Sequence, residues 1–261
     1  FGKYIWGIVS QGDFGISYKT GKNVTSALLE RFPTTFVLAI ATCVIAMVLG
    51  VLLGILAANH QGTWIDSVLR VFGMAGVSMP IFWLGLLMIL WFAVDLKWFP
   101  VSGWYGPKYL VLPALTMGLT FTASLMRTTR SSMLDCIRQD YVITARAKGQ
   151  KERVITYHHV FRNALIPIIT AAGSAFGIAL CGAVVTEQVF SIPGLGSLMV
   201  NAITTRDYPL VRGSVLRVAV SFSLVNLLVD LLYACVDPRI KAQFAGKSLK
   251  KKKVREEATH E

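Results

Sequence analysis

Long, nearly uncharged apolar runs are the feature of this sequence that most limits how it can fold. Five of them come close to or exceed the ~20 apolar residues that a helix needs to cross a bilayer. They are Thr34–Ala58, Val68–Val94, Leu110–Met126, Ala164–Val185 and Gly213–Val236. Only 15% of the 261 residues are charged, against about a quarter in soluble domains. The sequence therefore predicts an all-α integral membrane protein, a polytopic helical bundle with five visible transmembrane helices.

Proline and glycine inside these runs predict how the helices bend and pack. Pro80 lies within the second run and predicts a kink, because proline lacks the amide hydrogen that a helix interior uses. Gly50 and Gly54, and likewise Gly173 and Gly177, have the four-residue spacing that lets transmembrane helices approach closely. We expect these four glycines to be packing positions.

The distribution of lysine and arginine predicts which loops face the cytoplasm. Residues 127–162 hold eight of them against three acids, and the tail after Val236 holds eight more. By the positive-inside rule both segments are cytoplasmic, so residues 59–67 lie inside while residues 95–109 and 186–212 lie outside. The formal charge of +12 then reflects topology and contact of the tail with anionic membrane lipid. We expect no nucleic-acid partner.

Five spans with a cytoplasmic C-terminus would place residue 1 outside. We therefore expect a missing first helix, which would give six spans with both ends inside. On this basis residues 1–33 form an external segment that follows the missing helix. Residues 34–236 form the transmembrane domain, with a cytoplasmic loop over 127–163, and residues 237–261 form a basic cytoplasmic tail.

The sequence offers no catalytic or metal-binding constellation. His158 and His159 are adjacent and face different directions on a helix, and the four cysteines lack metal-ligand or redox spacing. Gly246-Lys-Ser248 resembles the end of a phosphate-binding loop, but Lys241 stands where its first glycine should be and no strand precedes it. We expect no catalytic residue, no metal and no cofactor on this chain.

The cytoplasmic loop is about 35 residues long and has the features of folded structure. Residues 140–161 are rich in helix formers, and Gly149 separates two short helical pieces. The two predicted faces are Tyr141, Ala145 and Lys148, and Val142, Arg146 and Gly149. A basic amphipathic helix can lie on lipid headgroups or dock in a groove of a cytoplasmic partner. The residues alone leave both alternatives open.

Several motifs carry a family resemblance that covers nearly the whole chain. Ile143-Thr-Ala-Arg-Ala-Lys-Gly149, continuing through His159-Val-Phe-Arg-Asn-Ala-Leu-Ile-Pro167, resembles the EAA loop of binding-protein-dependent ABC importer permeases. The matching motifs elsewhere are Gly12-Asp-Phe-Gly-Ile-Ser17, Ser78-Met-Pro-Ile-Phe-Trp83, Arg127-Thr-Thr-Arg-Ser-Ser-Met-Leu134, Pro193-Gly-Leu-Gly196, Arg206-Asp-Tyr-Pro209, Val229-Asp-Leu-Leu-Tyr233 and Asp237-Pro-Arg-Ile240. Together they resemble the dipeptide/oligopeptide/nickel permease family.

The resemblance implies a subunit of the type I ABC importer permease kind, multi-pass in the bacterial inner membrane. It also implies a second homologous permease, two cytoplasmic ATPase subunits that bind ATP and Mg²⁺, and an external solute-binding protein. The residues that it assigns to ATPase coupling are Thr144, Ala145, Arg146, Ala147, Lys148, Gly149, Lys151 and Arg153. The sequence departs from the family pattern at Ile143, where an acid is usual, and at Arg162, where a proline is usual.

Two further sets of residues are weaker candidates. The outer segment Thr186–Val211 is either an ordered external loop that caps the helices or, with residues 95–109, the face where the binding protein docks. The resemblance favours docking, with Pro193, Gly194, Gly196, Arg206 and Asp207 as candidates. For the translocation path, the candidates are polar residues in the runs, namely Ser78, Ser174, Arg217 and Asn226. Arg217 either reaches the outer headgroups or lies on that path. Asp230, near the inner end, is expected to pair with cytoplasmic basic residues.

The resemblance implies a transport subunit, without enzymatic activity of its own, that translocates di- and oligopeptides. A permease for nickel, metal chelates or glutathione is the alternative within the same family. An ion-coupled secondary transporter is more distant, because such proteins tend to have inverted repeats and carboxylates near the bilayer midplane, and neither is evident in this sequence. A membrane-embedded enzyme would need a convergent catalytic set.

Overall fold

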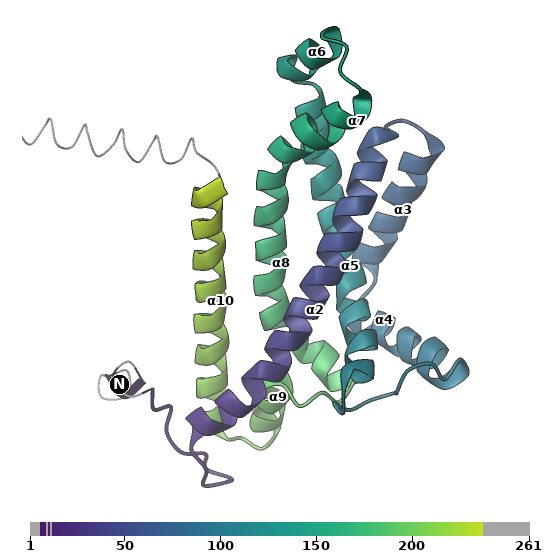
Figure 1. Cartoon of the computed structure of the whole chain (residues 1–261). Coiled ribbons are helices and arrows are strands. Elements are labelled where there is room, and N and C mark those ends of the chain that lie inside the picture. Colours follow the sequence, from purple (N-terminus) through teal and green to yellow (C-terminus); the bar gives the residue numbers. More distant parts are fainter. Residues whose placement is uncertain (1–5, 9, 11, 237–261) are drawn as a thin grey trace, which may run out of the picture.

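The computed structural model describes residues 6–8, 10 and 12–236, and this part of the chain is built almost entirely of helices (Figure 1). The α-helices are α2 (Val24–Asn59), α3 (Trp64–Ser78), α4 (Ile81–Met88), α5 (Pro107–Ile137), α6 (Asp140–Ala147), α7 (Glu152–Val154), α8 (Phe161–Val189), α9 (Leu195–Thr204) and α10 (Tyr208–Val236). Two π-helical segments, η1 (Ile89–Asp95) and η2 (Ile155–Val160), continue α4 and α7. The prediction of an all-α bundle is confirmed.

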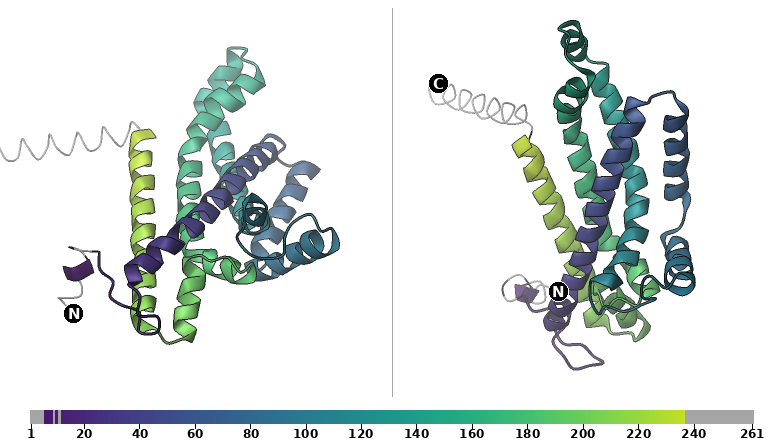
Figure 2. Two further views of the ribbon diagram at one scale, coloured as in Figure 1. Left: turned by 60° about the horizontal axis from the view of Figure 1, so that its bottom comes forward. Right: turned by 45° about the vertical axis from the view of Figure 1, so that its right-hand side comes forward.

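Among the described residues, four helical stretches are long and apolar enough to cross a membrane. They lie in α2, in α5, in α8 together with the turns that precede it, and in α10. The remaining predicted span, the second apolar run Val68–Val94, is not one helix. It consists of α3 and the α4–η1 pair, whose axes differ by 102° (Figure 2). Met79 takes an extended conformation (φ −80°, ψ 127°) before Pro80, as the residue before a proline prefers. The predicted kink at Pro80 is therefore confirmed, and it is a sharp bend that divides the predicted span into two helical parts.

The predicted boundaries were too short for the long helices, most of all for α2 and α5. α2 begins at Val24, where the side chain of Asn23 accepts a hydrogen bond from the Thr25 amide at 2.8 Å, a usual helix N-cap. α5 continues to Ile137, so the first part of the predicted loop 127–163 belongs to a long helix. Polar residues extend this helix beyond the apolar run, which is why hydropathy alone ended it at Met126.

The segments predicted to share a side lie at the same end of the bundle. The α2–α3 turn, the α6–α7 region and the last residues of α10 lie at the top of Figure 1. The α4–η1 pair, the start of α5, and α9 lie at or near the other end. We call these the cytoplasmic and the external end, following the distribution of charge.

Helix packing uses the glycines that the spacing singled out. A Cβ on Gly54 would lie 2.5 Å from Cβ of Thr129 in α5, and one on Gly50 would lie 2.9 Å from Cβ of Leu125. In α8, Gly173 and Gly177 lie equally close to side chains of α10. Real Cβ atoms do not come this close, so these positions admit only glycine without a shift. The packing interpretation of these residues is confirmed.

A buried ion pair fastens α3 to α5 near the cytoplasmic end. Asp66 is 1% exposed, and its two carboxylate oxygens accept hydrogen bonds from Nε and Nη2 of Arg130 at 2.7 and 2.8 Å. The amide of Gly62 adds a third bond at 3.1 Å. This two-pronged geometry is the strong arrangement for arginine and a carboxylate, and it holds the start of α3 against the bundle.

Candidate functional site

The cytoplasmic end carries a folded loop built on a glycine turn. α6 ends at Ala147, and the chain reverses through Gly149, whose φ is +73°. The Gly149 amide donates to the carbonyl of Arg146 at 2.9 Å. A φ in this region strains residues that have a Cβ, and glycine adopts it freely. The prediction that Gly149 separates two helical pieces is confirmed.

The inward face of α6 differs from both predicted faces. Val142 is 0% and Ala145 is 7% exposed, while Ile143 between them is 58% exposed. Val142 and Ala145 belong to one apolar cluster with residues of α2, α5 and α8, among them Ile55, Met133 and Ile168. The buried pair follows i, i+3 spacing, whereas the predicted faces combined residues i, i+4 and i+7. The loop is thus packed onto the helix ends.

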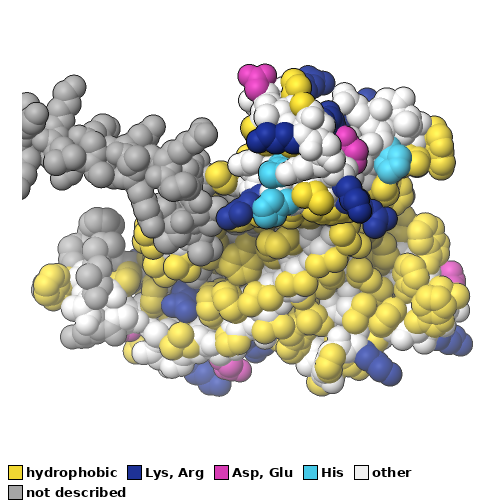
Figure 3. Space-filling view, turned by 45° about the horizontal axis from the view of Figure 1, so that its top comes forward, with side chains coloured by type: hydrophobic (Ala, Val, Ile, Leu, Met, Phe, Trp, Pro, Cys, Tyr) yellow, Lys and Arg dark blue, Asp and Glu magenta, His cyan; other side chains and the backbone are white. Residues whose placement is uncertain are grey.

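Seven of the eight predicted coupling residues are on the surface and one is not. The exposed ones are Thr144, Arg146, Ala147, Lys148, Gly149, Lys151 and Arg153. Ala145 points into the apolar cluster, so its side chain is not available to a partner as the resemblance implied. Figure 3 shows lysine, arginine and histidine side chains gathered on the lobe at this end, above an apolar body.

Arg146 already has a partner within the loop. Its Nε and Nη2 donate to the carboxylate of Glu152 at 2.8 and 3.3 Å, across the turn at Gly149. The hydrogen bond from Arg146 lowers the pKa of Glu152 below its usual value, and the same pair raises the pKa of Arg146. Because both side chains are exposed, the pair closes the turn more than it stabilises the fold.

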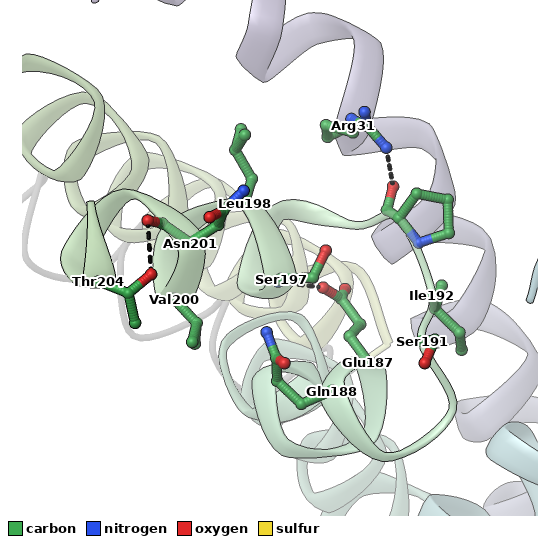
Figure 4. A pocket seen from close by; sticks show the side chains of 11 residues that line it. Arg31, Glu187, Gln188, Ser191, Ile192, Ser197, Leu198, Val200, Asn201 and Thr204 are labelled. Carbon is green, nitrogen blue, oxygen red and sulfur yellow. Dashed lines mark hydrogen bonds between the residues drawn. The ribbon is translucent and has the colours of Figure 1, made fainter. Parts of the chain in front are cut away.

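The external end is organised around a buried carboxylate, Glu187, at the end of α8. It is 0% exposed and accepts hydrogen bonds from the hydroxyl of Thr35 in α2 at 2.6 Å and from the Ser197 amide at 2.9 Å (Figure 4). The Gly196 amide donates to it as well. These amides are in the first turn of α9, where a helix offers unpaired N–H groups and favours negative charge. Glu187 therefore caps α9 and ties it to α2.

Two of the residues predicted to dock a binding protein take part in this internal contact. Gly194 and Gly196 are buried, a Cβ on Gly194 would collide with the Glu187 side chain, and one on Gly196 would lie 2.5 Å from Cα of Val184. Both glycines therefore allow close packing against α8, and their docking role stays a prediction. Pro193, beside them, is half-buried.

Asp207 is also an internal residue rather than a surface contact. It is buried and accepts hydrogen bonds from the Ser17 hydroxyl and, at 3.2 Å, from the Tyr18 amide. Burial by itself would raise the pKa of Asp207, but these bonds and others from the Lys19 and Leu210 amides outweigh it and lower the pKa. Asp207 thus joins the external segment to the start of α10.

Of the predicted docking residues, Arg206 is fully on the surface. It has a φ of +56° and is exposed in the turn between α9 and α10. Its place leaves docking open as a prediction for this position, beside the half-buried Pro193.

A polar cavity of about 500 Å³ opens beside the Glu187 contact. It lies between α2, the end of α8, and α9 (Figure 4). Its lining residues are Arg31, Glu187, Gln188, Ser191, Ile192, Pro193, Ser197, Leu198, Val200, Asn201 and Thr204. The volume falls in the range of small-molecule sites, which is about 300–1,000 Å³.

The four predicted path residues lie on three different helices, α3, α8 and α10. Ser78 ends α3 and donates to the Met74 carbonyl at 2.9 Å, on the side of the bundle away from α10 (Figure 1). Ser174 is exposed on α8 and Asn226 is half-buried on α10. Arg217 places its guanidinium carbon 4.5 Å from the ring centre of Phe32 in α2, a cation–π contact. This contact was not among the two alternatives considered for Arg217.

Two expectations concern parts of the chain outside the described residues. The side chain of Asp230 and the basic tail 237–261 lie outside the described residues. Among the residues that are described, no group of three His, Cys, Asp or Glu side chains is placed to hold a metal ion.

The sequence reasoning missed Glu187, Thr35 and Arg31 at the external end, and the Asp66–Arg130 pair at the other. The available signal was a charged residue in or next to an apolar run, since such residues are costly unless they have a partner. Glu187 follows the fourth run by two positions, and Arg31 precedes the first by three. Their partners could not be read from local spacing.

Comparisons with known proteins place these features in a family context. The family model described as "Binding-protein-dependent transport system inner membrane component" matches residues 50–242. The chain is 40% identical over 231 residues to the glutathione transport system permease protein GsiC of Escherichia coli K12, covering 88% of this chain and 76% of that protein. It is 41% identical over 233 residues to the protein of the same name in Salmonella typhi, covering 89% and 76%.

Solved structures share the fold at much lower sequence identity. An inward-facing conformation of the MetNI methionine ABC transporter matches with a TM-score of 0.67 at 16% identity, covering 81% of this chain and 97% of that one. An amino acid ABC transporter crystallised with histidines matches with a TM-score of 0.58 at 15% identity, covering 82% and 94%.

Proposed function

Because this chain belongs to the family of binding-protein-dependent transport system inner membrane components, we propose that it imports small peptides and peptide-like solutes, glutathione included. It is a multi-pass permease subunit of an ABC importer in the inner membrane, and separate subunits hydrolyse the ATP. The solute class rests on two relatives that are named for glutathione transport. Glutathione is a tripeptide, so it belongs to the peptide class that the motifs favour.

The proposed assembly contains a second related permease, two cytoplasmic ATPases that carry ATP and Mg²⁺, and an external solute-binding protein. Transport follows from alternating access. ATP and the loaded binding protein both favour one conformer, and hydrolysis returns the other, so that the bundle opens in turn to each side.

We assign ATPase coupling to the outward face of α6 and the turn at Gly149. One observation carries this assignment: the exposed basic residues lie directly above an apolar cluster that joins α6 to α2, α5 and α8. A force on the exposed face therefore reaches three long helices through packed side chains. Lipid headgroups would also accept the basic residues, but would not explain why the loop is packed into the bundle.

Substitution at Gly149 tests the coupling assignment. No atom lies within 4 Å of a Cβ built there, so a side chain finds open space within this chain. Asparagine and aspartate are the residues other than glycine that best tolerate positive φ. We expect Gly149→Asp and Gly149→Asn to leave membrane insertion intact, while transport is uncoupled from ATP hydrolysis. Normal solute uptake by Gly149→Asp in proteoliposomes would refute the docking role, and Gly149→Asn separates the effect of size from that of charge.

The solute class has its own test. The reconstituted importer with its cognate binding protein should accumulate labelled glutathione or short peptides in an ATP-dependent manner. Uptake of nickel or a nickel chelate, with no uptake of either peptide class, would replace this proposal by the metal-chelate alternative.

A further inference from the structure

The cavity at the external end has a composition suited to one kind of ligand. Among its lining residues, Arg31 is the one cation, and Gln188, Ser191, Asn201 and Thr204 offer neutral hydrogen-bonding groups. The apolar lining residues are the smaller share. A guanidinium beside neutral hydrogen-bonding groups suits a polar molecule that carries a carboxylate.

Most N–H donors of the Arg31 guanidinium are not used by the described part of the chain. Its guanidinium makes one long hydrogen bond, 3.5 Å from Nη1 to the carbonyl of Pro193. In the described part of the chain no carboxylate lies within 4.0 Å of it. A guanidinium has five N–H donors in a fixed fork that matches a carboxylate. Arg31 therefore retains the capacity to bind a carboxylate with two hydrogen bonds.

The other charged residue of the cavity wall does not compete for this role. Glu187 is fully buried, and its oxygens already accept hydrogen bonds from Thr35 and Ser197. Its charge faces the first turn of α9. Figure 4 shows Arg31 on α2 directed toward Pro193 and the Glu187 carboxylate directed toward Ser197.

We propose that this cavity is an entry subsite for the solute, in which Arg31 binds a solute carboxylate. The proposal deepens the proposed function and rests on it. Peptides and glutathione carry carboxylates at neutral pH, and a volume of about 500 Å³ accommodates a di- or tripeptide. The amide of Gln188 and the side chains of α9 can then pair with the peptide backbone. The cavity lies at the end from which an imported solute arrives.

The test compares one solute with and without its carboxylates. The complete importer is reconstituted in proteoliposomes with binding protein loaded to saturation, either with glutathione or with glutathione diamide, in which both carboxylates are carboxamides. Loss of one charge-assisted bidentate pair corresponds to a change on the order of ten- to a hundredfold. We expect Arg31→Gln to lower uptake of glutathione by that factor relative to uptake of the diamide.

A matched control removes a positive charge at the same end but away from the cavity. Lys108 is exposed at the start of α5 and does not line the cavity, so Lys108→Gln should leave the ratio of the two uptake rates unchanged. Arg31→Lys keeps the charge but not the fork, and we expect it to retain an intermediate ratio. If Arg31→Gln does not assemble into the importer, the uptake ratio of Arg31→Lys serves as the test.

Three results would overturn the proposal. An unchanged ratio of glutathione uptake to diamide uptake in the Arg31 variants would show that Arg31 does not bind the solute carboxylate. Equal loss for both solutes, together with weaker stimulation of ATP hydrolysis by the binding protein, would assign the cavity to the binding protein instead. If the unaltered importer transports neither glutathione nor peptides, the proposed function is refuted, and the subsite proposal that rests on it is refuted as well.

Discussion

Gly194→Ala should weaken the hydrogen bonds that hold the start of α9, without straining the backbone at position 194. The backbone at Gly194 has φ −103° and ψ −171°, which alanine adopts without strain. Only space opposes the change, because the new Cβ would lie 2.5 Å from Oε2 of Glu187 and still nearer to Oε1. Ordinary contact begins at 3.4 Å. Oε2 must therefore move by about 0.9 Å, the difference between 3.4 and 2.5 Å, and Oε1 must move farther.

A displacement of that size breaks the bonds that cap α9. If the carboxylate moves directly away from its donors by at least about 0.9 Å, the bonds from Thr35 and Ser197 stretch from 2.6 and 2.9 Å to about 3.5 and 3.8 Å or more, past the range of a good hydrogen bond. Each such bond to a charged group contributes about 1.5–3 kcal/mol, so partial loss of two gives about 3 kcal/mol. At 1.4 kcal/mol per factor of ten, this corresponds to about a hundredfold.

Hydrogen exchange measures this effect where it occurs. In the purified importer in nanodiscs, Gly194→Ala should lower the protection of the Gly196 and Ser197 amides by about a hundredfold. Gly7→Ala is the control, because its Cβ would meet only the Asp13 carbonyl oxygen, at 4.0 Å. Protection in the Gly194 variant equal to that in the control would refute the assigned role of the carboxylate.

A second variant tests the steric cause. Glu187→Asp shortens the side chain by one methylene and draws the carboxylate back from position 194. The double variant should therefore be less damaged than the sum of the two single changes, by about 1–2 kcal/mol. Strict additivity would mean that Gly194→Ala acts through something other than collision with Glu187.

Three further changes are predicted from the remaining contacts. Because the pKa of Asp207 is lowered, its bonds to the external segment hold at neutral pH and are lost as the pH falls below about 4. The protection of the Tyr18 amide against hydrogen exchange should therefore fall over the same pH range, and Asp207→Asn should remove this pH dependence. Asp66→Asn leaves a partly buried arginine without its partner and should cost about 2 kcal/mol in thermal unfolding, against less than about 1 kcal/mol for the more exposed Arg70→Gln. Glu152→Gln should likewise change thermal stability by less than about 1 kcal/mol, since its ion pair is exposed.

Much of the architecture could be predicted because membrane insertion is governed by local composition. Apolar run length identified four of the long helices, and Pro80 marked the break in the second run. Glycine spacing identified the close contacts of α2 with α5 and of α8 with α10, because a residue without a side chain allows any neighbouring helix to approach closely. These inferences need no knowledge of the partner residue.

The external site depended on partners that are distant in the sequence. Thr35 and Glu187 are 152 residues apart in the chain, and neither lies in a local pattern that names the other. The motif Pro193-Gly-Leu-Gly196 was noticed but was assigned to an outer surface, because buried and exposed glycines look alike in a sequence. Likewise the 102° bend at Pro80 depends on what α4 packs against, and a proline specifies only that the helix is interrupted.

The two ends of the bundle are linked by the same pair of helices. At the cytoplasmic end, α2 and α8 meet in the apolar cluster that holds α6, through residues such as Ile55 and Ile168. At the external end they are joined again through Thr35 and Glu187. A pair of long helices fastened at both ends moves as one body more readily than it bends, because packed interiors resist small deformations. If α6 has the coupling role that we propose, we expect a displacement of its surface to be transmitted along α2 and α8 to the wall of the external cavity, where Arg31 lies on one helix and Gln188 on the other.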